Sequence, residues 1–295
     1  MSMNQKLGAW WLAARPKTLA AGLAPVLVGT AVAHTHGGIR VLPALAAALG
    51  SLLIQIATNL ANDYFDHKKG ADTEDRLGPS RAVQQGWISP NAMLTATILT
   101  LIAALGVGVF LIQIGGWPIA AIGVASLVCA IAYTGGPYPL AYIGLGDVFV
   151  FLFFGLAAVV GTTWVQTHSA PPAAWIGGAA VGMLATAILV VNNLRDRHTD
   201  AVANKRTLAV RWGGDAARIE HGAMIAGAYL LVIAGALCSW VPWPSTIGAL
   251  CTLPLAISEI KAVRLKDGAD LNPHLGGAAR LELVFSLLFG LGFLL

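Results

Sequence analysis

The chain has 295 residues and a net charge of +4; 57% of the residues are hydrophobic, 11% are charged, and the mean hydropathy is +0.72. Soluble domains have roughly a quarter of their residues charged, so this composition excludes a soluble globular protein. Residues 82–146, 148–194 and 221–258 contain no Asp, Glu, Lys or Arg. Each stretch is long enough for two membrane helices of about 20 residues. The basic balance then suits anionic lipid headgroups, and we expect no nucleic-acid partner.

Gly- and Pro-rich turn signals divide the uncharged stretches: GGWP at 115–118, SAPP at 169–172 and VPWP at 241–244. We therefore predict an all-α integral membrane protein, a single transmembrane domain over residues 1–295 with nine spans. The predicted helices cover 18–36, 41–66, 90–114, 117–134, 143–168, 173–198, 217–240, 244–265 and 275–295.

The basic residues indicate how the chain is oriented in the membrane. All of them except Arg40 fall on one side of the predicted spans, and by the positive-inside rule that side is the cytoplasm. This predicts a cytoplasmic N-terminus and a C-terminus on the opposite side. All fourteen Asp and Glu residues also fall on the cytoplasmic side, although acidic residues contribute little to topology. We infer that the carboxylates on the cytoplasmic face have a functional role.

A first polar cluster ends the second predicted helix, in NLANDYFDHKKGAD at 59–72. Its members Asn59, Asn62, Asp63 and Asp66 are spaced by three or four residues, which places them along one side of a helix. Acidic residues at a helix end are often only a solvated surface, and that alternative stays open for one cluster taken alone.

A second cluster of the same design ends the sixth predicted helix, in NNLRDRHTD at 192–200. There Asn192, Asp196 and Asp200 are four residues apart and share one helix face. Two such clusters on one side of the membrane make a solvated surface the weaker explanation. Carboxylate and amide oxygens suit Mg²⁺, which usually takes one or two carboxylates and completes its shell with water and substrate phosphates. The sequence therefore predicts a Mg²⁺ site.

Basic residues accompany both clusters. Lys68, Arg76 and Arg81 lie after the first cluster and Lys205 after the second. Carboxylates, Mg²⁺ and Lys or Arg side chains together are the groups that hold a diphosphate, because the metal bridges carboxylate and phosphate oxygens and the cations neutralise the remaining charge. The positive-inside rule alone explains some of these residues, so their individual roles are weaker predictions than those of the aspartates.

NDYFD followed by KGAD, with NNLRDRHTD and NKRTLAVRWG, resembles the two Asp-rich motifs of the UbiA superfamily of intramembrane prenyltransferases. RPKTL at 15–19, RLGPSRAVQQGWIS at 76–89 and YIGLGD at 142–147 resemble the branch that acts on 1,4-dihydroxy-2-naphthoate in menaquinone synthesis. The resemblance implies a UbiA-type bundle of nine helices in the bacterial cytoplasmic (inner) membrane, with the active site facing the cytoplasm. It also implies Mg²⁺-dependent transfer of a polyprenyl group from polyprenyl diphosphate to the naphthoate ring, with loss of the ring carboxylate, to give demethylmenaquinone.

The resemblance also implies roles for single residues. The implied metal ligands are Asn62, Asp63, Asp66, Asp196 and Asp200, with Asn59 and Asn192 as helpers. The residues implied to bind the diphosphate are Arg15, Lys68, Arg76, Arg81 and Lys205. With the four aspartates, Asp147 is the fifth expected catalytic residue.

Two further assignments concern the aromatic acceptor and the loop after the first motif. Asp147 and Tyr138 are expected to contact the acceptor or take its proton. A structural role at a helix start for Asp147 and an ordinary interfacial role for Tyr138 stay open. Asp72 follows the first motif either as a ligand through water or as a loop residue.

Other functions remain as alternatives. One is prenyl transfer to another aromatic acceptor, such as 4-hydroxybenzoate or homogentisate. Another, of a different class, is a cation-coupled membrane carrier. Carriers commonly bind their cation near the bilayer midplane, whereas the acids here lie at or beyond the cytoplasmic ends of the predicted spans. The position of the acids therefore favours the enzyme.

Overall fold

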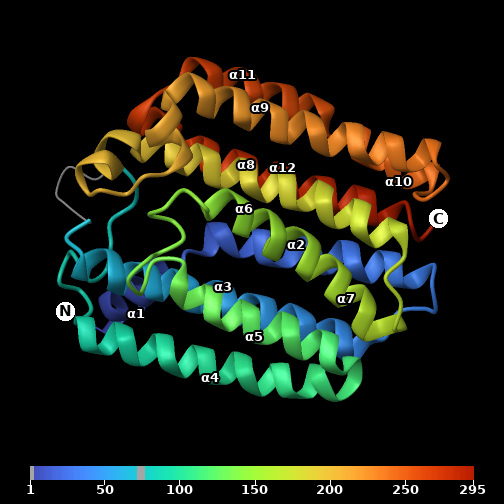
Figure 1. Ribbon diagram of the computed structural model, residues 1–295, viewed down its shortest axis with the longest axis horizontal. Coiled ribbons are helices and arrows are strands. Elements are labelled where there is room, and N and C mark those ends of the chain that lie inside the picture. Colours follow the sequence, from blue (N-terminus) through green and yellow to red (C-terminus); the bar gives the residue numbers. More distant parts are fainter. Residues whose placement is uncertain (1–2, 72–76) are drawn as a thin grey trace.

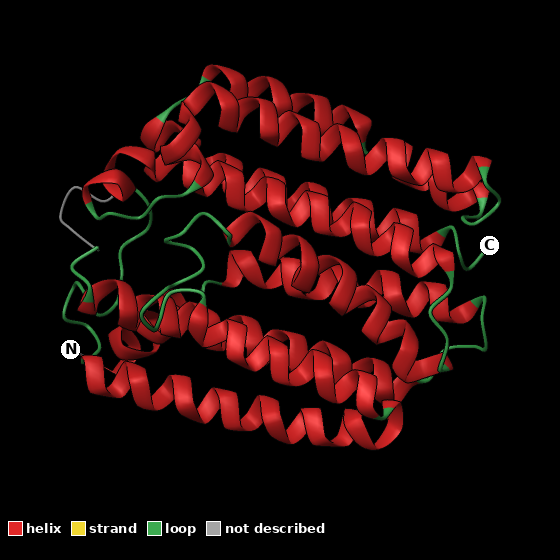
Figure 2. Cartoon of the chain, in the orientation of Figure 1, coloured by secondary structure: helices red, strands yellow, loops and turns green. Residues whose placement is uncertain are grey.

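The computed structural model describes residues 3–71 and 77–295, and these residues form helices and loops without a strand. Figure 2 shows helices running alongside one another, with the longest loops gathered at one end. Asp72 and Arg76 lie outside the described residues. The expectation of an all-α chain is confirmed.

Proline marks many of the helix starts. It stands in the first turn of α2, α4, α5, α8, α10, α11 and α12, where its missing N–H has no intrahelical partner to lose. The helices are α1 (Met3–Ala14), α2 (Pro16–His34), α3 (Val41–Lys68), α4 (Pro90–Gly115), α5 (Trp117–Ala132), α6 (Gly146–Val150), the π-helix η1 (Phe151–Ala157), α7 (Ala158–Thr167), α8 (Pro172–Val202), α9 (Leu208–Leu237), α10 (Trp243–Leu250), α11 (Leu253–Leu265), the 3₁₀-helix η2 (Gly268–Leu271) and α12 (Asn272–Leu291).

Each of the nine predicted ranges contains a helix, but the helices differ in their ability to span a membrane. In the described part of the chain, six single helical segments are long and apolar enough to cross, and up to eight spans result if two bent pairs each count as one. The bent pairs are α1 with α2, at 49°, and α10 with α11, at 42°. Helix α5 has 16 residues and is a shorter apolar helix. The protein is therefore a multi-pass membrane protein with six to eight candidate spans, and nine spans stay a prediction.

The largest cluster of buried apolar residues lies mainly in the second half of the chain. A core of buried residues joins α2, α8, α9 and α12, with Val28, Leu184, Ile225 and Phe285 at its centre. The π-helix η1 lies close to α8 because glycines meet there. A Cβ added at Gly155 would lie 2.4 Å from the carbonyl oxygen of Gly178, so no larger residue fits without moving one helix.

The two ends of the bundle differ. Helices α3 and α8 both finish at the end where the described chain begins, and the loops after α3, α5 and α8 gather there (Figure 1). The C-terminus lies at the opposite end. Both Asp-rich clusters are therefore carried to the same end of the molecule by the last turns of two helices.

Candidate functional site

A cavity of about 370 Å³ runs inside the bundle, and its two ends have different chemistry. The end near the loops is polar. Its lining includes Arg15, Asn59, Asn62, Asp66, Arg81, Asn192 and Lys205. The lining at the other end is apolar and comes from the last part of α4, the first part of α5 and the last part of α7. It includes Leu111, Ile112, Ile119 and Val165. One cavity thus joins a charged chamber to an apolar channel.

In the first cluster, Asp66 and Asn62 face the chamber. The hydroxyl of Tyr142 donates to Oδ1 of Asp66 at 2.8 Å, and Nη2 of Arg81 lies 3.3 Å from Oδ2. Oδ1 of Asn62 accepts from the hydroxyl of Thr134 at 2.8 Å. The loop after α5 therefore closes over the first cluster.

Asp63 is placed differently. Its carboxylate is buried and accepts from the backbone N–H groups of Ala82 (3.0 Å) and Val83 (3.3 Å). It is not among the residues that line the cavity. Helix spacing predicts that Asp63 shares a side with Asp66, but positions three apart on a helix still differ in direction by about 60°. In this structure the Asp63 carboxylate binds the loop after α3, whereas the Asp66 carboxylate faces the chamber.

The residues of the second cluster also lie in different surroundings. Asn192 lines the cavity, whereas Asp196 does not and is bound by the guanidinium of Arg195, which donates to both of its oxygens. Oδ1 of Asp200 lies 3.3 Å from Nζ of Lys205, while Oδ2 is buried without a partner. Asp200, like Asp196, is not among the residues that line the cavity, but one of its oxygens has no hydrogen-bond partner.

Three of the predicted basic residues reach the cavity: Arg15, Arg81 and Lys205. Lys68 does not; it is exposed, and its ammonium lies 5.9 Å from the ring centre of Tyr64. Its sequence neighbour Lys69 instead donates to the carbonyl oxygen of Thr134 at 2.6 Å.

The acidic residues around Lys205 stabilise the positive charge of its ammonium group. Burial alone would lower the pKa of this ammonium. The carboxylates of Asp200, Asp66 and Asp196 raise the pKa by more, so that it lies above its ordinary value. Both clusters therefore act on one cation, and Lys205 is positively charged at neutral pH.

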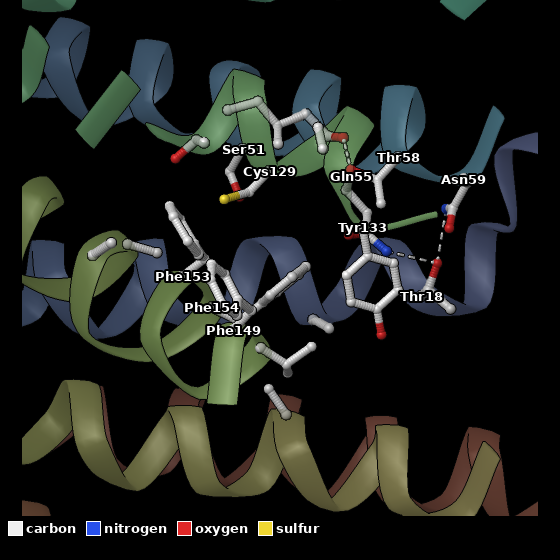
Figure 3. Close-up of a pocket in the computed structure, with 18 of the residues that line it drawn as sticks. Thr18, Ser51, Gln55, Thr58, Asn59, Cys129, Tyr133, Phe149, Phe153 and Phe154 are labelled. Carbon is white, nitrogen blue, oxygen red and sulfur yellow. Dashed lines mark hydrogen bonds between the residues drawn. The ribbon is translucent and has the colours of Figure 1, made fainter. Parts of the chain in front are cut away.

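The cavity also has an aromatic wall, shown in Figure 3. Phe149 and Phe153 are stacked, with ring centres 6.0 Å apart and planes at 13°, and both line the cavity. Asp147, at the start of this helical segment, also lines the cavity, and both of its carboxylate oxygens are buried without a partner. A carboxylate and stacked rings on one wall suit an aromatic ligand that carries hydroxyl groups.

Tyr138 does not fit its expected position against such a ligand. It is 79% exposed and is not among the residues lining the cavity, because the loop after α5 turns its ring outward. Tyr133 lines the cavity instead, and Figure 3 shows its ring between Thr18 and the phenylalanine side chains. Sequence reasoning missed Tyr133, Tyr142 and Thr134. The only available signal was their place in the polar segment between two apolar helices.

The described side chains are compatible with Mg²⁺, although no three His, Cys, Asp or Glu side chains among them form a ready metal cage. Mg²⁺ needs only one or two protein carboxylates when a substrate supplies phosphate oxygens. Asp66 and Asn62 offer such oxygens in the lining of the cavity, and Asp200, which does not line it, has one buried oxygen without a partner. The donor set therefore fits a hard divalent cation.

Comparison with known proteins agrees with this geometry. Residues 22–280 match the UbiA prenyltransferase family. A 1,4-dihydroxy-2-naphthoate octaprenyltransferase of Haemophilus influenzae is 38% identical to this chain, over 99% of it and 98% of that protein. The protein of the same name in Escherichia coli is also 38% identical, over 97% of this chain and 95% of that protein.

A solved structure shares the fold. A UbiA homolog from Archaeoglobus fulgidus, bound to DMAPP and Mg²⁺, has a TM-score of 0.65 at 15% identity, over 95% of this chain and 98% of that one. The family match covers most of the chain, and the two relatives cover nearly all of it. The chain is thus an enzyme that belongs to the UbiA prenyltransferase family.

Proposed function

We propose that this enzyme transfers a polyprenyl group from polyprenyl diphosphate to 1,4-dihydroxy-2-naphthoate, with loss of the ring carboxylate as CO₂, to give demethylmenaquinol, the reduced form of demethylmenaquinone. The observation that carries the proposal is the cavity, because it joins a chamber lined by Asp66, Arg81 and Lys205 to an apolar channel. Such a cavity accommodates a molecule with an anionic head and a hydrocarbon tail. The names of the relatives support the naphthoate as acceptor.

The chamber would bind the diphosphate. Asp66, Asp200 and Asn62 would hold Mg²⁺, and Asp63 and Asp196 would join them by exchanging their present partners. When bound, Mg²⁺ would stabilise the negative charge that develops on the leaving diphosphate.

Basic side chains complete the diphosphate site. Arg15, Arg81 and Lys205 neutralise the remaining phosphate charge, so that the allylic C–O bond can break with both electrons on the diphosphate.

The channel would bind the tail. Its lining is mainly of Leu, Ile and Val side chains, which suits a hydrocarbon chain and keeps water away from the allylic cation. Water would otherwise capture the cation and give a free prenyl alcohol. The apolar channel therefore protects the reaction as well as binding the substrate.

The aromatic wall would bind the acceptor. Phe149 and Phe153 present a flat apolar surface for the naphthalene ring, and Asp147 accepts a hydrogen bond from a ring hydroxyl. As the ring carbon attacks the cation, electron density leaves this hydroxyl and its proton passes to Asp147. Both unpartnered oxygens of Asp147 are available for this role.

The site would face the cytoplasm of a bacterium, with the enzyme in the cytoplasmic (inner) membrane among lipid partners. The positive-inside distribution supports a cytoplasmic N-terminus and a C-terminus on the other side, and the two Asp-rich clusters lie at the N-terminal end of the bundle. Nine spans then require α5 to cross as well as the two bent pairs. A soluble, charged naphthoate would reach the chamber from the cytoplasm, and the product would stay in the membrane.

A turnover assay tests the proposal. Purified protein in liposomes would receive Mg²⁺, a polyprenyl diphosphate and either 1,4-dihydroxy-2-naphthoate or 4-hydroxybenzoate, with an EDTA control. We expect demethylmenaquinol, detected as demethylmenaquinone after oxidation by air, to form only with the naphthoate and only with the metal. Product only from the hydroxybenzoate would overturn the acceptor. No product from folded protein would favour a cation-coupled carrier.

A further inference from the structure

Arg15 joins α1 to α2 in a backbone conformation that residues with a side chain rarely adopt. Its φ is 52° and its ψ is 67°, in the left-handed region. The next residue is Pro16, and the residue before a proline normally takes an extended conformation. The side chain of Arg15 lines the polar chamber. The surrounding structure must therefore stabilise an unfavourable backbone in order to keep this guanidinium in the chamber.

Thr18, one turn into α2, makes the contacts that do so. Its hydroxyl donates to the carbonyl oxygen of Arg15 at 2.9 Å. It also accepts two hydrogen bonds from α3, from Nδ2 of Asn59 and from Nε2 of Gln55, each at 3.1 Å. Figure 3 shows these two amides converging on the hydroxyl. A hydroxyl has one proton to donate and two lone pairs, so Thr18 uses its full capacity.

Asn59 extends the same network to the other side of Arg15. Its Nδ2 also donates to the carbonyl oxygen of Ala14 at 3.0 Å. The carbonyl groups on both sides of the Arg15 α-carbon are therefore bound, one by Asn59 and one by Thr18. Both side chains are fixed on helix positions, so the peptide units before and after Arg15 have little freedom to rotate.

We infer that Thr18 is a positioning residue for the diphosphate: with Asn59 and Gln55 it holds the Arg15 backbone in its left-handed conformation and thereby aims the Arg15 guanidinium into the chamber. This inference rests on the proposed role of the chamber in diphosphate binding. Thr18 carries no charge and needs no contact with the substrate, which is why charge-based reading of the sequence does not find it. The backbone N–H of Thr18 also donates to the carbonyl oxygen of Arg15, at 2.9 Å. Loss of the hydroxyl would therefore leave that bond but remove the link from Arg15 to the amides of Asn59 and Gln55, and the guanidinium would be held less firmly in the chamber.

The test measures binding of geranylgeranyl diphosphate with Mg²⁺ by titration calorimetry in detergent, separately from turnover. Thr18→Val removes the hydroxyl at nearly constant volume, and Thr18→Ser keeps it. Thr30→Val is the matched control, because Thr30 also lies on α2 and its hydroxyl also accepts from a buried amide, Nε2 of Gln166 at 3.1 Å, but it does not line the cavity. Arg15→Ala and the Arg15→Ala/Thr18→Val double variant complete the set.

We expect Thr18→Val to weaken diphosphate binding about tenfold, as for loss of a buried hydrogen-bond network, and Thr18→Ser and Thr30→Val to change it less than about twofold. If Thr18 acts through Arg15, Thr18→Val has no further effect in the Arg15→Ala background. Normal binding by Thr18→Val, or multiplicative effects in the double variant, would overturn the inference.

The outcomes also separate this inference from the proposed function. If the wild type binds the diphosphate with the expected variant pattern but forms no prenylated naphthoate, the proposed acceptor fails and the positioning role stands. If the wild type forms product and Thr18→Val binds the diphosphate as tightly as the wild type, the positioning role fails alone. A wild type that binds no diphosphate would overturn both.

Discussion

Arg195 and Asp196 are consecutive residues of α8 and are also partners in a two-point ion pair, with Nε 2.7 Å from Oδ1 and Nη2 2.6 Å from Oδ2. The guanidinium also donates to Asn192 and Asn272 and is almost completely buried. Gly78 lies against it, because a Cβ at that position would come within 2.6 Å of Nη2. The second Asp-rich cluster is therefore held by its own arginine and covered by the loop after α3.

Because the Arg195–Asp196 pair is buried, we predict that replacing Arg195 destabilises the protein more than replacing Arg197. Arg195→Leu would leave the Asp196 carboxylate buried without its partner, which costs about 3–5 kcal/mol. Arg197→Leu is the control, since its partner Asp267 is about half exposed and such pairs contribute no more than about 1 kcal/mol. Thermal unfolding in detergent should show a large fall in Tm for the first variant and a small fall for the second. Equal falls would contradict the importance of burial.

Asp200→Asn should raise the Mg²⁺ concentration needed for half-maximal turnover and lower the maximal rate on the order of 100-fold, as for loss of one charged group from a preorganised site. The unpartnered oxygen of Asp200 is the reason, because the amide replaces a carboxylate that is available to the metal. The exposed Asp270 provides the control. A rate and a Mg²⁺ dependence in Asp200→Asn equal to those of Asp270→Asn would remove Asp200 from the metal site.

Asp147→Asn should impair the acceptor half of the reaction selectively. The amide keeps the shape of the side chain but is a poor base, and general-base groups contribute about 100-fold or more. We expect kcat to fall by that amount while the KM for polyprenyl diphosphate stays within about threefold of the wild-type value. Steady-state kinetics with each substrate varied in turn measures both. A selective rise in the diphosphate KM would instead place Asp147 in the diphosphate site.

Gly123→Phe should shorten the prenyl chain that the enzyme accepts. Gly123 lines the cavity, and a Cβ added there would meet nothing within 4 Å, so the new ring would occupy the channel itself. Gly106→Phe is the matched control, because it has equally open surroundings but does not line the cavity. The ratio of kcat/KM for a long and a short prenyl diphosphate should fall only in Gly123→Phe. An unchanged ratio would mean that the tail lies elsewhere.

The Arg197–Asp267 pair predicts a pH-dependent stability. The hydrogen bond from Arg197 holds the pKa of Asp267 down to about 2, below the value of about 3.9 for a free aspartate. The folded state therefore binds fewer protons than the unfolded state in this range, so the contribution is complete above pH 4 and is lost as the pH falls from about 4 to about 2. The Tm difference between wild type and Asp267→Asn should be constant from pH 5 to pH 7 and shrink below pH 4. A difference that grew on acidification would have the wrong sign.

Much of the fold could be predicted because uncharged stretches must be helical in a membrane, where each backbone group needs a partner. Helices cover all nine predicted ranges. Helix α1 was not predicted, since it lies before the first apolar run. Helix α9 begins at Leu208, before the predicted 217, but Gly213 (φ 87°, ψ 171°) is non-helical, and this kink separates a short first segment from the long helix. The start of α9 is set by Thr207, whose hydroxyl accepts from the N–H of Val210.

The site was predicted less completely, because spacing along one helix does not show what lies opposite. The sequence places Asp63 and Asp66 close together, but their partners differ. The backbone N–H groups of Ala82 and Val83 donate to Asp63, and the hydroxyl of Tyr142 donates to Asp66. The Tyr142 contact spans 76 positions in the sequence, and no local pattern encodes it. The hydroxyl-bearing residues Thr18, Thr134, Tyr133 and Tyr142 were missed for the same reason, because only their contacts in the fold show their importance.

The contact of Gly155 with α8 limits how the enzyme can move. The wall that carries Asp147 and the phenylalanines cannot slide or expand against α8 without separating two backbones already in contact. On the other side of the cavity, Gly106 and Gly108 of α4 have open surroundings. We therefore expect any movement that lets a lipid tail enter to come from the α4 side of the cavity more than from the acceptor wall. The side of the cavity formed by η1 and α8 would then stay fixed during the reaction, while the α4 side would move to admit the prenyl chain.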